Sequence, residues 1–496
     1  MDAEQLRDDV RSGRIDAERL VDLVVMLQKQ LQDALRRIEE LEKELGRRTP
    51  PKPDEPFSMR AEEQRQEARG KKKPPQRRAK RRGRNRTAEK VAQAERTEQV
   101  FPEGVAENDC KFSHTRPVWR LENGRAVLVA YEIYRAGNRF GKIPGVPDKG
   151  EFGIEISLAI AYQVYVVGLS FDKVCLLMNF FQNLDLKKSQ ADALLNRLSQ
   201  QWESEFDILC TLLANSEVIH TDETSWSIHS VWAFLSEKVR VLFFGVHKDA
   251  DTLEEILDSE TFEGIVVSDD AAVYANFTNA QKCWAHLLRK AIKLTLLERD
   301  NAEYREFADR LLEIYREACR VQRDRRLSDA GRERKVGELD DDVLSLCAAV
   351  WSAELPPTEG PANDYRLLVN ELMRLMLRGE LFTFVTAQPT AAPNGHTQPV
   401  SGTNNEAERT LRPAAEARKT GRTSKTLRGA RRRTVIVSVL ESLRQHLTTF
   451  TLASVIDEVS QSLARGRSCF TDLLTALNLP PPTDSVLDRL LPHPGG

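Results

Sequence analysis

Long apolar runs are missing from this chain of 496 residues. None reaches the ~18 residues that a membrane-spanning helix needs, so we expect no membrane association. The first residues, MDAEQLRDDVRSG, also lack the apolar core of a signal peptide. The sequence therefore predicts a cytosolic protein.

Cysteine is scarce as well, because the chain has seven cysteines, an odd number, and they are scattered. This pattern does not suggest a disulfide framework and agrees with a reducing compartment. The length is too great for one ordinary core, so we expect two or more domains with linkers.

A strong net charge is absent too, since the formal charge is -2. The charges are not evenly mixed, however, because residues 71–86 (KKKPPQRRAKRRGRNR) hold ten Lys or Arg and no acid. The like charges of such a block repel one another, which favours binding to a polyanion. It is typical of a solvated linker, of a DNA-phosphate contact, or of both at once. The candidate contacts are Lys71, Lys72, Lys73, Arg77, Arg78, Lys80, Arg81 and Arg82.

A heptad pattern precedes this basic block. Apolar residues recur every seven positions from Val24 to Leu45, and a second set runs from Leu27 to Leu41. This predicts a two-stranded coiled coil, and hence a homodimer or higher oligomer. A single amphipathic helix packed on its own protein is the alternative.

Two apolar-periodic segments lie further along, at Phe171 to Phe181 and Lys188 to Trp202, with a short turn around Asn183 between them. That is the outline of a helix-turn-helix and predicts DNA contact, although any helical hairpin has the same pattern.

Short β-rich runs follow Asn215, at residues 217–220, 231–235, 239–246 and 264–267, with a helical segment at 251–257 before the last. Three strands, a helix and another strand are the order of a ribonuclease-H-like core. We therefore predict an α/β fold in which a helical insertion interrupts this core.

Three acids stand where this fold would put catalytic groups. Asp222 and Asp269 are predicted to end the first and fourth strands, and Glu408 lies in the first turn of a later helix. Carboxylates are the ligands that Mg²⁺ prefers, and two ions ~4 Å apart activate a nucleophile and stabilise the leaving oxygen of a phosphodiester. A single Asp at a strand end is also a common turn former.

The glutamate has a rival. Asn405-x-x-Glu408 and Thr403-x-x-Glu406 are both spaced like capping boxes. The two glutamates lie roughly 200° apart around a helix, so they cannot both face one site. Spacing alone does not choose between them.

Four motifs occur in order: HTDETSW, GIVVSDDAAVY, QKCWAHLLRK, and NNEAERTLRP followed by RKTGRTSKTLRGA. Together they resemble the signatures of insertion sequence 66 family transposases over roughly residues 150 to 450. The resemblance implies a bacterial Asp-Asp-Glu transposase whose acids are Asp222, Asp269 and Glu408. Asp270 departs from the pattern, because the family usually has glycine there.

The same resemblance implies two Mg²⁺ ions, with Mn²⁺ as a substitute, and double-stranded DNA as partner, both element ends and target. Small accessory proteins of the element and a place at the nucleoid are further expectations. Several arginines close to the glutamate in the sequence would bind the scissile phosphate and its neighbours. The candidate DNA contacts here are Arg409, Arg412, Arg418, Lys419 and Arg422, and Arg431 to Arg433 follow.

Cysteine and histidine give two smaller expectations. Cys283 and His286 have a metal-like spacing, but two ligands do not make a zinc site. We therefore interpret them as packing residues or as residues that place DNA. Members of the family often carry a cysteine-rich segment before the core, and this chain has only Cys110 and His114 there, which predicts no zinc.

The alternatives to a transposase are a catalytically inactive DNA-binding regulator and a ribonuclease-H-like nuclease without strand transfer. The predicted domains are 1–50, coiled coil; 51–108, disordered basic linker; 109–149, β-rich segment; 150–213, helical DNA-binding region; 214–294, first part of the core; 295–403, helical insertion and loop; 404–450, second part of the core; and 451–496, C-terminal helical segment and tail.

Overall fold

The computed structural model describes residues 86–146, 150–351, 359–391, 395 and 397–493. The coiled coil predicted for residues 1–50 and the basic residues from Lys71 to Arg82 lie outside the described residues. Within the described part of the chain, no helix is both long and apolar enough to cross a membrane.

A small sheet occupies residues 96–140. The hairpin of β2 and β3 turns at Asn123 and Gly124, whose φ angles of 49° and 78° fit the left-handed turn that an Asn-Gly pair favours. The elements of this region are α4 (Arg86–Ala92), β1 (Arg96–Val100), β2 (Lys111–Glu122), β3 (Arg125–Ala136) and β4 (Arg139–Phe140).

The linker predicted for residues 51–108 extends too far, because α4 and β1 lie inside it. β1 pairs in parallel with β3, from Arg96 opposite Val129 to Val100 opposite Ile133. Its sequence, RTEQV, is short and polar, so only the pairing with β3 makes it a strand.

Helices fill residues 154–214. They are α5 (Ile154–Ala161), the π-helical turn η2 (Tyr162–Val166), α6 (Phe171–Gln182), α7 (Lys188–Gln201) and α8 (Glu203–Ala214). Asn183 ends α6 with a φ of 55°, a left-handed cap conformation that asparagine tolerates better than most residues. The two predicted helices and the turn between them are confirmed, and their contact with DNA stays a prediction.

A five-stranded mixed sheet has the order β7-β6-β5-β8-β9. β5, β6 and β7 pair antiparallel, whereas β8 runs parallel to β5 and β9 runs parallel to β8. These elements are β5 (Val218–Ser225), β6 (Ser230–Ser236), β7 (Arg240–Val246), α9 (Ala250–Ile256), β8 (Ile265–Ser268) and β9 (Ala280–Lys282). The predicted mixed α/β class and four of the strands are confirmed, while β9 was not predicted.

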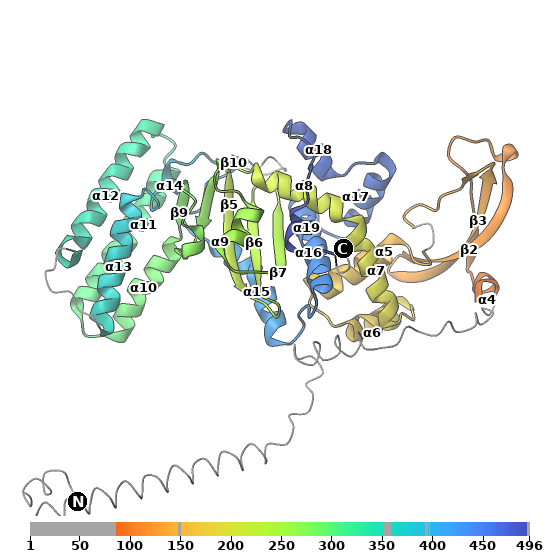
Figure 1. Cartoon of the computed structure of the whole chain (residues 1–496), viewed down its shortest axis with the longest axis horizontal. Coiled ribbons are helices and arrows are strands. Elements are labelled where there is room, and N and C mark those ends of the chain that lie inside the picture. Colours follow the sequence, from red (N-terminus) through yellow and green to blue (C-terminus); the bar gives the residue numbers. More distant parts are fainter. Residues whose placement is uncertain (1–85, 147–149, 352–358, 392–394, 396, 494–496) are drawn as a thin grey trace, which may run out of the picture. The chain divides into compact units, whose positions relative to one another are not determined.

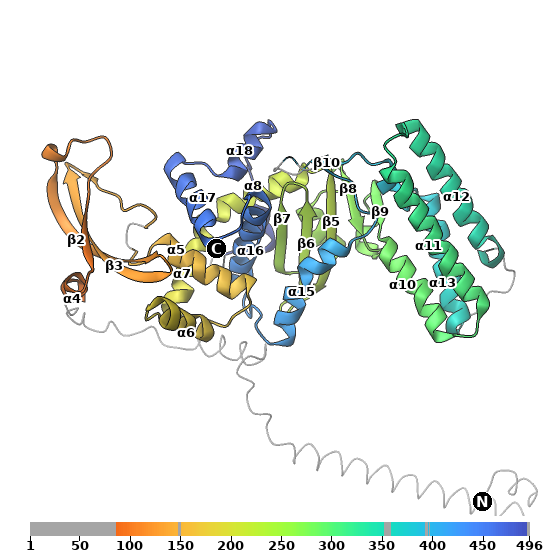
Figure 2. The same ribbon diagram turned by 180° about the vertical axis from the view of Figure 1, so that it is seen from behind.

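The insertion between β9 and α15 is a set of long helices with its own apolar core, to which Phe307, Leu311, Leu339 and Leu372 contribute. Figure 1 shows these helices on the β9 side of the sheet and α16 on the β7 side, and Figure 2 shows the same arrangement from behind. The helices are α10 (Trp284–Leu297), α11 (Ala302–Arg323), α12 (Asp329–Trp351), α13 (Gly360–Leu377) and α14 (Thr383–Thr386), and a short β10 (Thr390–Ala391) pairs with β11 (Thr397–Gln398).

The last region begins with two helices close to their predicted bounds, α15 (Asn405–Lys419) and α16 (Leu427–His446). They are followed by α17 (Leu452–Arg465), α18 (Cys469–Ala476) and α19 (Val486–Leu490). α15 packs against β5 and β6, and α16 packs along β7.

β7 is an edge strand, and α16 covers it with hydroxyl groups. The backbone N–H groups of Phe244, Leu242 and Arg240 donate to Thr434 Oγ1 at 2.9 Å, Ser438 Oγ at 2.9 Å and Ser442 Oγ at 3.0 Å. One hydroxyl per helical turn therefore meets every second residue of the strand, which satisfies an edge that would otherwise attract another chain.

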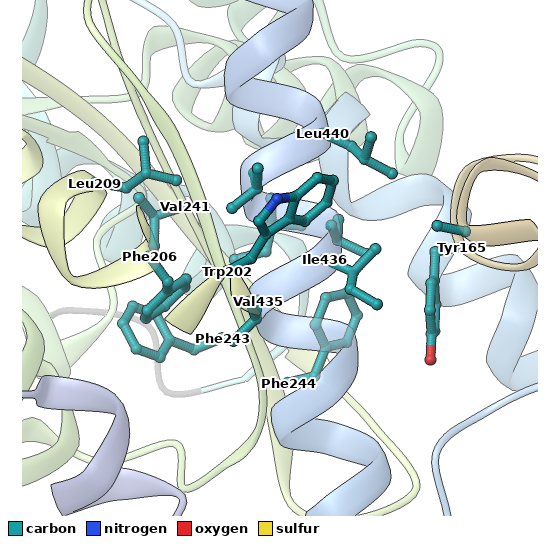
Figure 3. Close-up of a cluster of buried hydrophobic side chains, with 14 of the residues drawn as sticks. Tyr165, Trp202, Phe206, Leu209, Val241, Phe243, Phe244, Val435, Ile436 and Leu440 are labelled. Atoms are coloured by element: carbon teal, nitrogen blue, oxygen red, sulfur yellow. The ribbon is translucent and has the colours of Figure 1, made fainter. Parts of the chain in front are cut away.

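A buried core joins this seam to α8. Figure 3 shows Phe206 and Leu209 of α8 against Val241 and Phe243 of β7, with Val435 of α16 beside them. All five side chains are buried. Burial of each side chain contributes about 1.5–3 kcal/mol to folding, so this core stabilises the packing of α8 and α16 on the sheet.

Candidate active site

Asp222 and Asp269 lie on neighbouring strands of the five-stranded sheet. Asp222 was predicted to end its strand, but it lies inside β5, opposite Ala233 of β6. The parallel pairing of β5 with β8 stops two residues earlier, at His220 opposite Val267. Asp269 directly follows β8. Both aspartates therefore lie just beyond the paired stretch, where the carboxyl ends of parallel strands meet.

The charge around Asp222 is strongly negative. Its pKa is raised from 3.8 to about 7, mainly by burial and then by the nearby carboxylates of Glu223, Asp269 and Glu408, against a lowering hydrogen bond from the Glu223 backbone. Neither Asp222 nor Asp269 forms an ion pair with a described residue. The charges of the three predicted acids therefore influence one another, and neither aspartate has a cation of its own among the described residues.

The two glutamates of α15 point in different directions. Glu408 Oε1 lies 2.6 Å from Arg289 Nη2 and 3.6 Å from His286 Nε2, both on α10. Glu406 instead pairs with Arg240 of β7, at 2.5 Å. The geometry therefore agrees with the expected divergence, and Glu408 is the one whose charge reaches Asp222.

Neither candidate capping box forms, because α15 begins at Asn405 and its N-cap is neither Thr403 nor Asn405. Its N-cap is Asn404, whose side chain makes no cap hydrogen bond. Asn404 Nδ2 donates instead to the backbone oxygen of Thr221, at 2.7 Å. This bond ties the start of α15 to the residue before Asp222, and so sets where Glu408 lies relative to β5.

An ion pair beside Asp222, between the buried Glu223 and Lys248, was not predicted from the sequence. Glu223 accepts a hydrogen bond from the Tyr274 hydroxyl and lies 2.6 Å from Lys248 Nζ. The Glu223 carboxylate raises the pKa of Lys248, and the charges of Asp269 and Asp222 raise it as well. The charge of Lys248 is therefore felt by both aspartates, and about half of its side chain is exposed. Tyr274 stands in the motif GIVVSDDAAVY, but no local pattern in the sequence indicates its contact with Glu223.

A second missed group lies under the Asp269 loop. Lys282 of β9 is buried, its ammonium donates to Ser268 Oγ at 3.2 Å, and burial lowers its pKa. Asp270 forms an ion pair with Arg374 of α13. Asp270 is thus paired with the insertion. Among the residues that the structure describes, Asp269 Oδ1 accepts only the Ala271 N–H of its own turn, at 3.0 Å.

The predicted DNA contacts on and after α15 divide into two groups. Arg409, Arg412 and Lys419 are exposed. Arg418 donates to the backbone oxygen of Ser225 at 3.0 Å, and Arg422 to that of Gly168 at 2.8 Å. All five residues are exposed and offer charge to a partner, while Arg418 and Arg422 also hold the loops they contact.

Arg431 to Arg433 are not part of a surface arginine cluster, contrary to expectation. Arg431 pairs with Glu203 at 3.0 Å and Asp488 at 2.7 Å. Arg433 is buried against the rings of Tyr165, Trp226 and Phe244. Arg432 pairs with Asp192 at 2.5 Å. Their partners come from distant segments, which a local charge pattern does not reveal.

The earlier candidates for metal ligation also have defined places. Cys110 Sγ donates to the Ala106 oxygen at 3.4 Å, and His114 Nδ1 lies 3.1 Å from Ser113 Oγ. Cys283 and His286 instead lie beside Glu408, and the ligand atoms of these three residues are within 4.8 Å of one another.

The region that contains the site matches a model of a known protein family. A family model described as Transposase IS66 family matches residues 149–432, more than half of the chain. The matched region contains Asp222, Asp269 and Glu408. A search among curated proteins finds no match. The family that the four motifs resemble is confirmed, and the chain belongs to the transposases of the insertion sequence 66 family.

Proposed function

We propose that this chain binds the inverted ends of an insertion sequence, cuts them and joins them to target DNA, using Asp222, Asp269 and Glu408. The observation that carries the proposal is the gathering of these carboxylates, which with burial raises the pKa of Asp222 to about 7. Carboxylates that repel one another near neutral pH are a poor structural device and a good cation site.

The topology supports a ribonuclease-H-like core. Along the chain, three antiparallel strands are followed by a helix and then by two parallel strands of the same sheet. The long helical insertion, proposed as residues 295–403, separates the second aspartate from the glutamate. Because α15 returns to β5 through Asn404, the insertion interrupts the core in sequence while the acids stay together.

The donor set fits hard divalent cations. Asp222, Asp269 and Glu408 offer oxygen ligands of the kind that Mg²⁺ prefers, and Mn²⁺ accepts as well. Two such ions would activate the attacking oxygen and stabilise the leaving one. The chain's own part is to hold the carboxylates through β5, the Asp269 turn and the Asn404 bond. Lys248 and Arg289 supply positive charge beside them.

DNA would be held mainly through phosphates. Arg409, Arg412 and Lys419 present exposed charge on the same helix as Glu408. We propose that Arg418, Arg422 and the basic residues from Lys71 to Arg82 join them, with α6 and α7 as a further DNA contact. Self-association through residues 1–50, action at the nucleoid and cooperation with small accessory proteins of the same element complete the proposal.

The test uses oligonucleotide duplexes that carry an element end, with Mg²⁺ and a second duplex as target. The full chain is expected to cut and join, and Asp222→Asn, which keeps the shape but removes a charge, is expected to bind the duplex and do neither. Equal cleavage by Asp222→Asn would contradict the proposed site. Binding without cleavage by the wild-type chain would indicate a regulator, and cleavage without joining would indicate a nuclease.

A further inference from the structure

Cys283 and His286 open α10 immediately after β9. Cys283 is the N-cap and His286 lies in the first turn, three residues on, which puts both side chains on one side of the helix start. Cys283 is buried and His286 is half-buried. Neither ring nitrogen of His286 donates or accepts a hydrogen bond with a described residue, and Nδ1 is buried.

The start of α15 is joined to the start of α10. Trp284 N donates to the Gly402 oxygen at 3.0 Å, and Asn404 N donates to Cys283 Sγ at 3.1 Å. These bonds bring Glu408, one turn into α15, beside His286. A sulfur, an imidazole nitrogen and a carboxylate oxygen thus lie within 4.8 Å of one another, although the third residue is far away in the sequence.

This donor set differs in kind from the one formed by the two aspartates. A thiolate and an imidazole favour Zn²⁺ and similar cations, whereas Mg²⁺ demands oxygen ligands. Zinc bonds of about 2.0–2.3 Å in a tetrahedron place ligand atoms roughly 3.5 Å apart. The three atoms therefore need to approach by only about an ångström, which side-chain rotation supplies.

The Cys283 thiol is buried at the start of α10, where a thiolate without a cation beside it would be costly. A divalent cation displaces the thiol proton, and its positive charge offsets the cost of burying the thiolate. Arg289, 2.6 Å from Glu408, orients the carboxylate as an outer-shell partner.

We propose that Cys283, His286 and Glu408 form a three-ligand site for a thiophilic divalent cation, with the fourth position open to solvent. Zn²⁺ bound here engages Glu408 and competes with the Mg²⁺ ions for that carboxylate. The competition rests on the proposed function, whereas the binding site does not.

The binding experiment uses Co²⁺ as a spectroscopic probe of the metal-free full chain. Thiolate coordination produces a sulfur-to-cobalt charge-transfer band, which Zn²⁺ then displaces. We expect the band in the wild type and in the control Cys175→Ser, whose cysteine lies on α6. We expect it to disappear in Cys283→Ser. A wild-type chain without the band, or a band that survives in Cys283→Ser, would overturn the site.

A second variant covers the case in which Cys283→Ser fails to fold, since Cys283 is buried. His286→Asn changes a half-buried side chain, and circular dichroism checks its fold. Because even outer-shell partners change metal affinity roughly 10–100-fold, we expect this loss of a ligand to weaken Zn²⁺ binding about 100-fold or more. Unchanged Zn²⁺ affinity in a folded His286→Asn protein would also overturn the proposal.

The second experiment adds Zn²⁺ to the Mg²⁺-supported cleavage reaction and compares the fractional inhibition of each protein. We expect inhibition of the wild type and of Cys175→Ser, and much weaker inhibition of His286→Asn. Equal inhibition of all three would refute the competition for Glu408. Failure of the proposed function would look different, because cleavage would be absent without Zn²⁺ while the cobalt band remained.

Discussion

Polar groups at the β7 edge of the five-stranded sheet are hydrogen-bonded, whereas those beyond the ends of β5 and β8 are not fully paired. Along β7, α16 supplies a hydroxyl for each outward N–H, and Ser438 and Ser442 also donate back to the Leu242 and Arg240 oxygens at 3.2 and 3.0 Å. Beyond β5 and β8, carboxylates gather and the pKa of Asp222 rises to about 7. Satisfied polar groups indicate a structural seam, and unsatisfied charge indicates a ligand.

The same contrast separates acids that are close neighbours in the sequence. Each of the three motifs that contain acids carries one acid of the candidate site and a neighbouring acid that forms an ion pair of its own. Glu408 is also paired, with Arg289, but its charge reaches Asp222. The neutralised acids form three ion pairs: Glu223 with Lys248, Asp270 with Arg374, and Glu406 with Arg240. The sequence neighbours therefore serve as matched controls for Asp222, Asp269 and Glu408.

The largest expected effect comes from comparing Glu408→Gln with Glu406→Gln. Both changes remove one charge from the first turn of α15, but only Glu408 reaches Asp222. We expect Glu408→Gln to lower Mg²⁺-dependent cleavage more than roughly 100-fold, beyond the loss that an outer-shell change causes. Glu406→Gln is expected to stay within a few-fold of the wild type. Rates on one duplex at saturating Mg²⁺ measure both, and the reverse order would reassign the glutamate.

A second effect concerns stability and pH. The folded-state pKa of Asp222 is raised from 3.8 to about 7, so the folded state binds the proton more tightly than the unfolded chain does. The stability this provides is complete below about pH 4, falls as the pH rises to about 7, and is absent above that. At about 1.36 kcal/mol per pKa unit, the loss is at most about 4 kcal/mol.

Asp222→Asn removes this penalty, because an amide carries no charge. In chelator, its free energy of unfolding is expected to gain on the wild type between about pH 4 and 7, with a constant difference at higher pH. Mg²⁺ should stabilise the wild type more than the variant. Urea unfolding at several pH values measures this, and two parallel pH curves would show that Asp222 is not under electrostatic stress.

Much of the sheet was predictable because strand residues alternate or cluster locally. β5 to β8 and α9 follow patterns that are contained in their own sequences. β9 does not, since its residues Ala280 to Lys282 include a glutamine and a lysine that are buried. Gln281 Nε2 donates to the Leu381 oxygen at 2.9 Å, a partner in the insertion. Such a strand is stabilised by distant contacts, so its own composition does not indicate it.

The sequence motifs predicted the three acids of the candidate site, but they did not indicate the residues that surround these acids. The motifs indicated Asp222, Asp269 and Glu408, whereas spacing alone left Glu406 and Glu408 equal. What separates the glutamates is the Asn404 bond to Thr221, which joins segments that are distant in the sequence. The cation partners and the third member of the Cys283 and His286 cluster arise in the same way, from folding rather than from spacing.

A smaller effect tests the seam. Ser438→Ala leaves the buried N–H of Leu242 without its acceptor, which destabilises by about 1–3 kcal/mol. Cleavage on a folded protein is expected to persist, because the seam lies away from the acids. Ser460→Ala, at an exposed position of α17, is the control and should change the unfolding free energy by no more than about 0.5 kcal/mol. Equal effects of the two changes would show that water satisfies β7.

The smallest expected effect is that of Glu406→Gln on stability. Its pair with Arg240 spans 2.5 Å, but about half of the Glu406 side chain is exposed. Exposed pairs contribute about 0–1 kcal/mol, so we expect a loss within that range at low salt. At 1 M salt the Debye length is about 3 Å, and the difference from the wild type should vanish. Urea unfolding in both salts measures it. A loss above about 2 kcal/mol that salt leaves unchanged would mean that Glu406 is held in a desolvated site, and the contrast between the two glutamates would then need another cause.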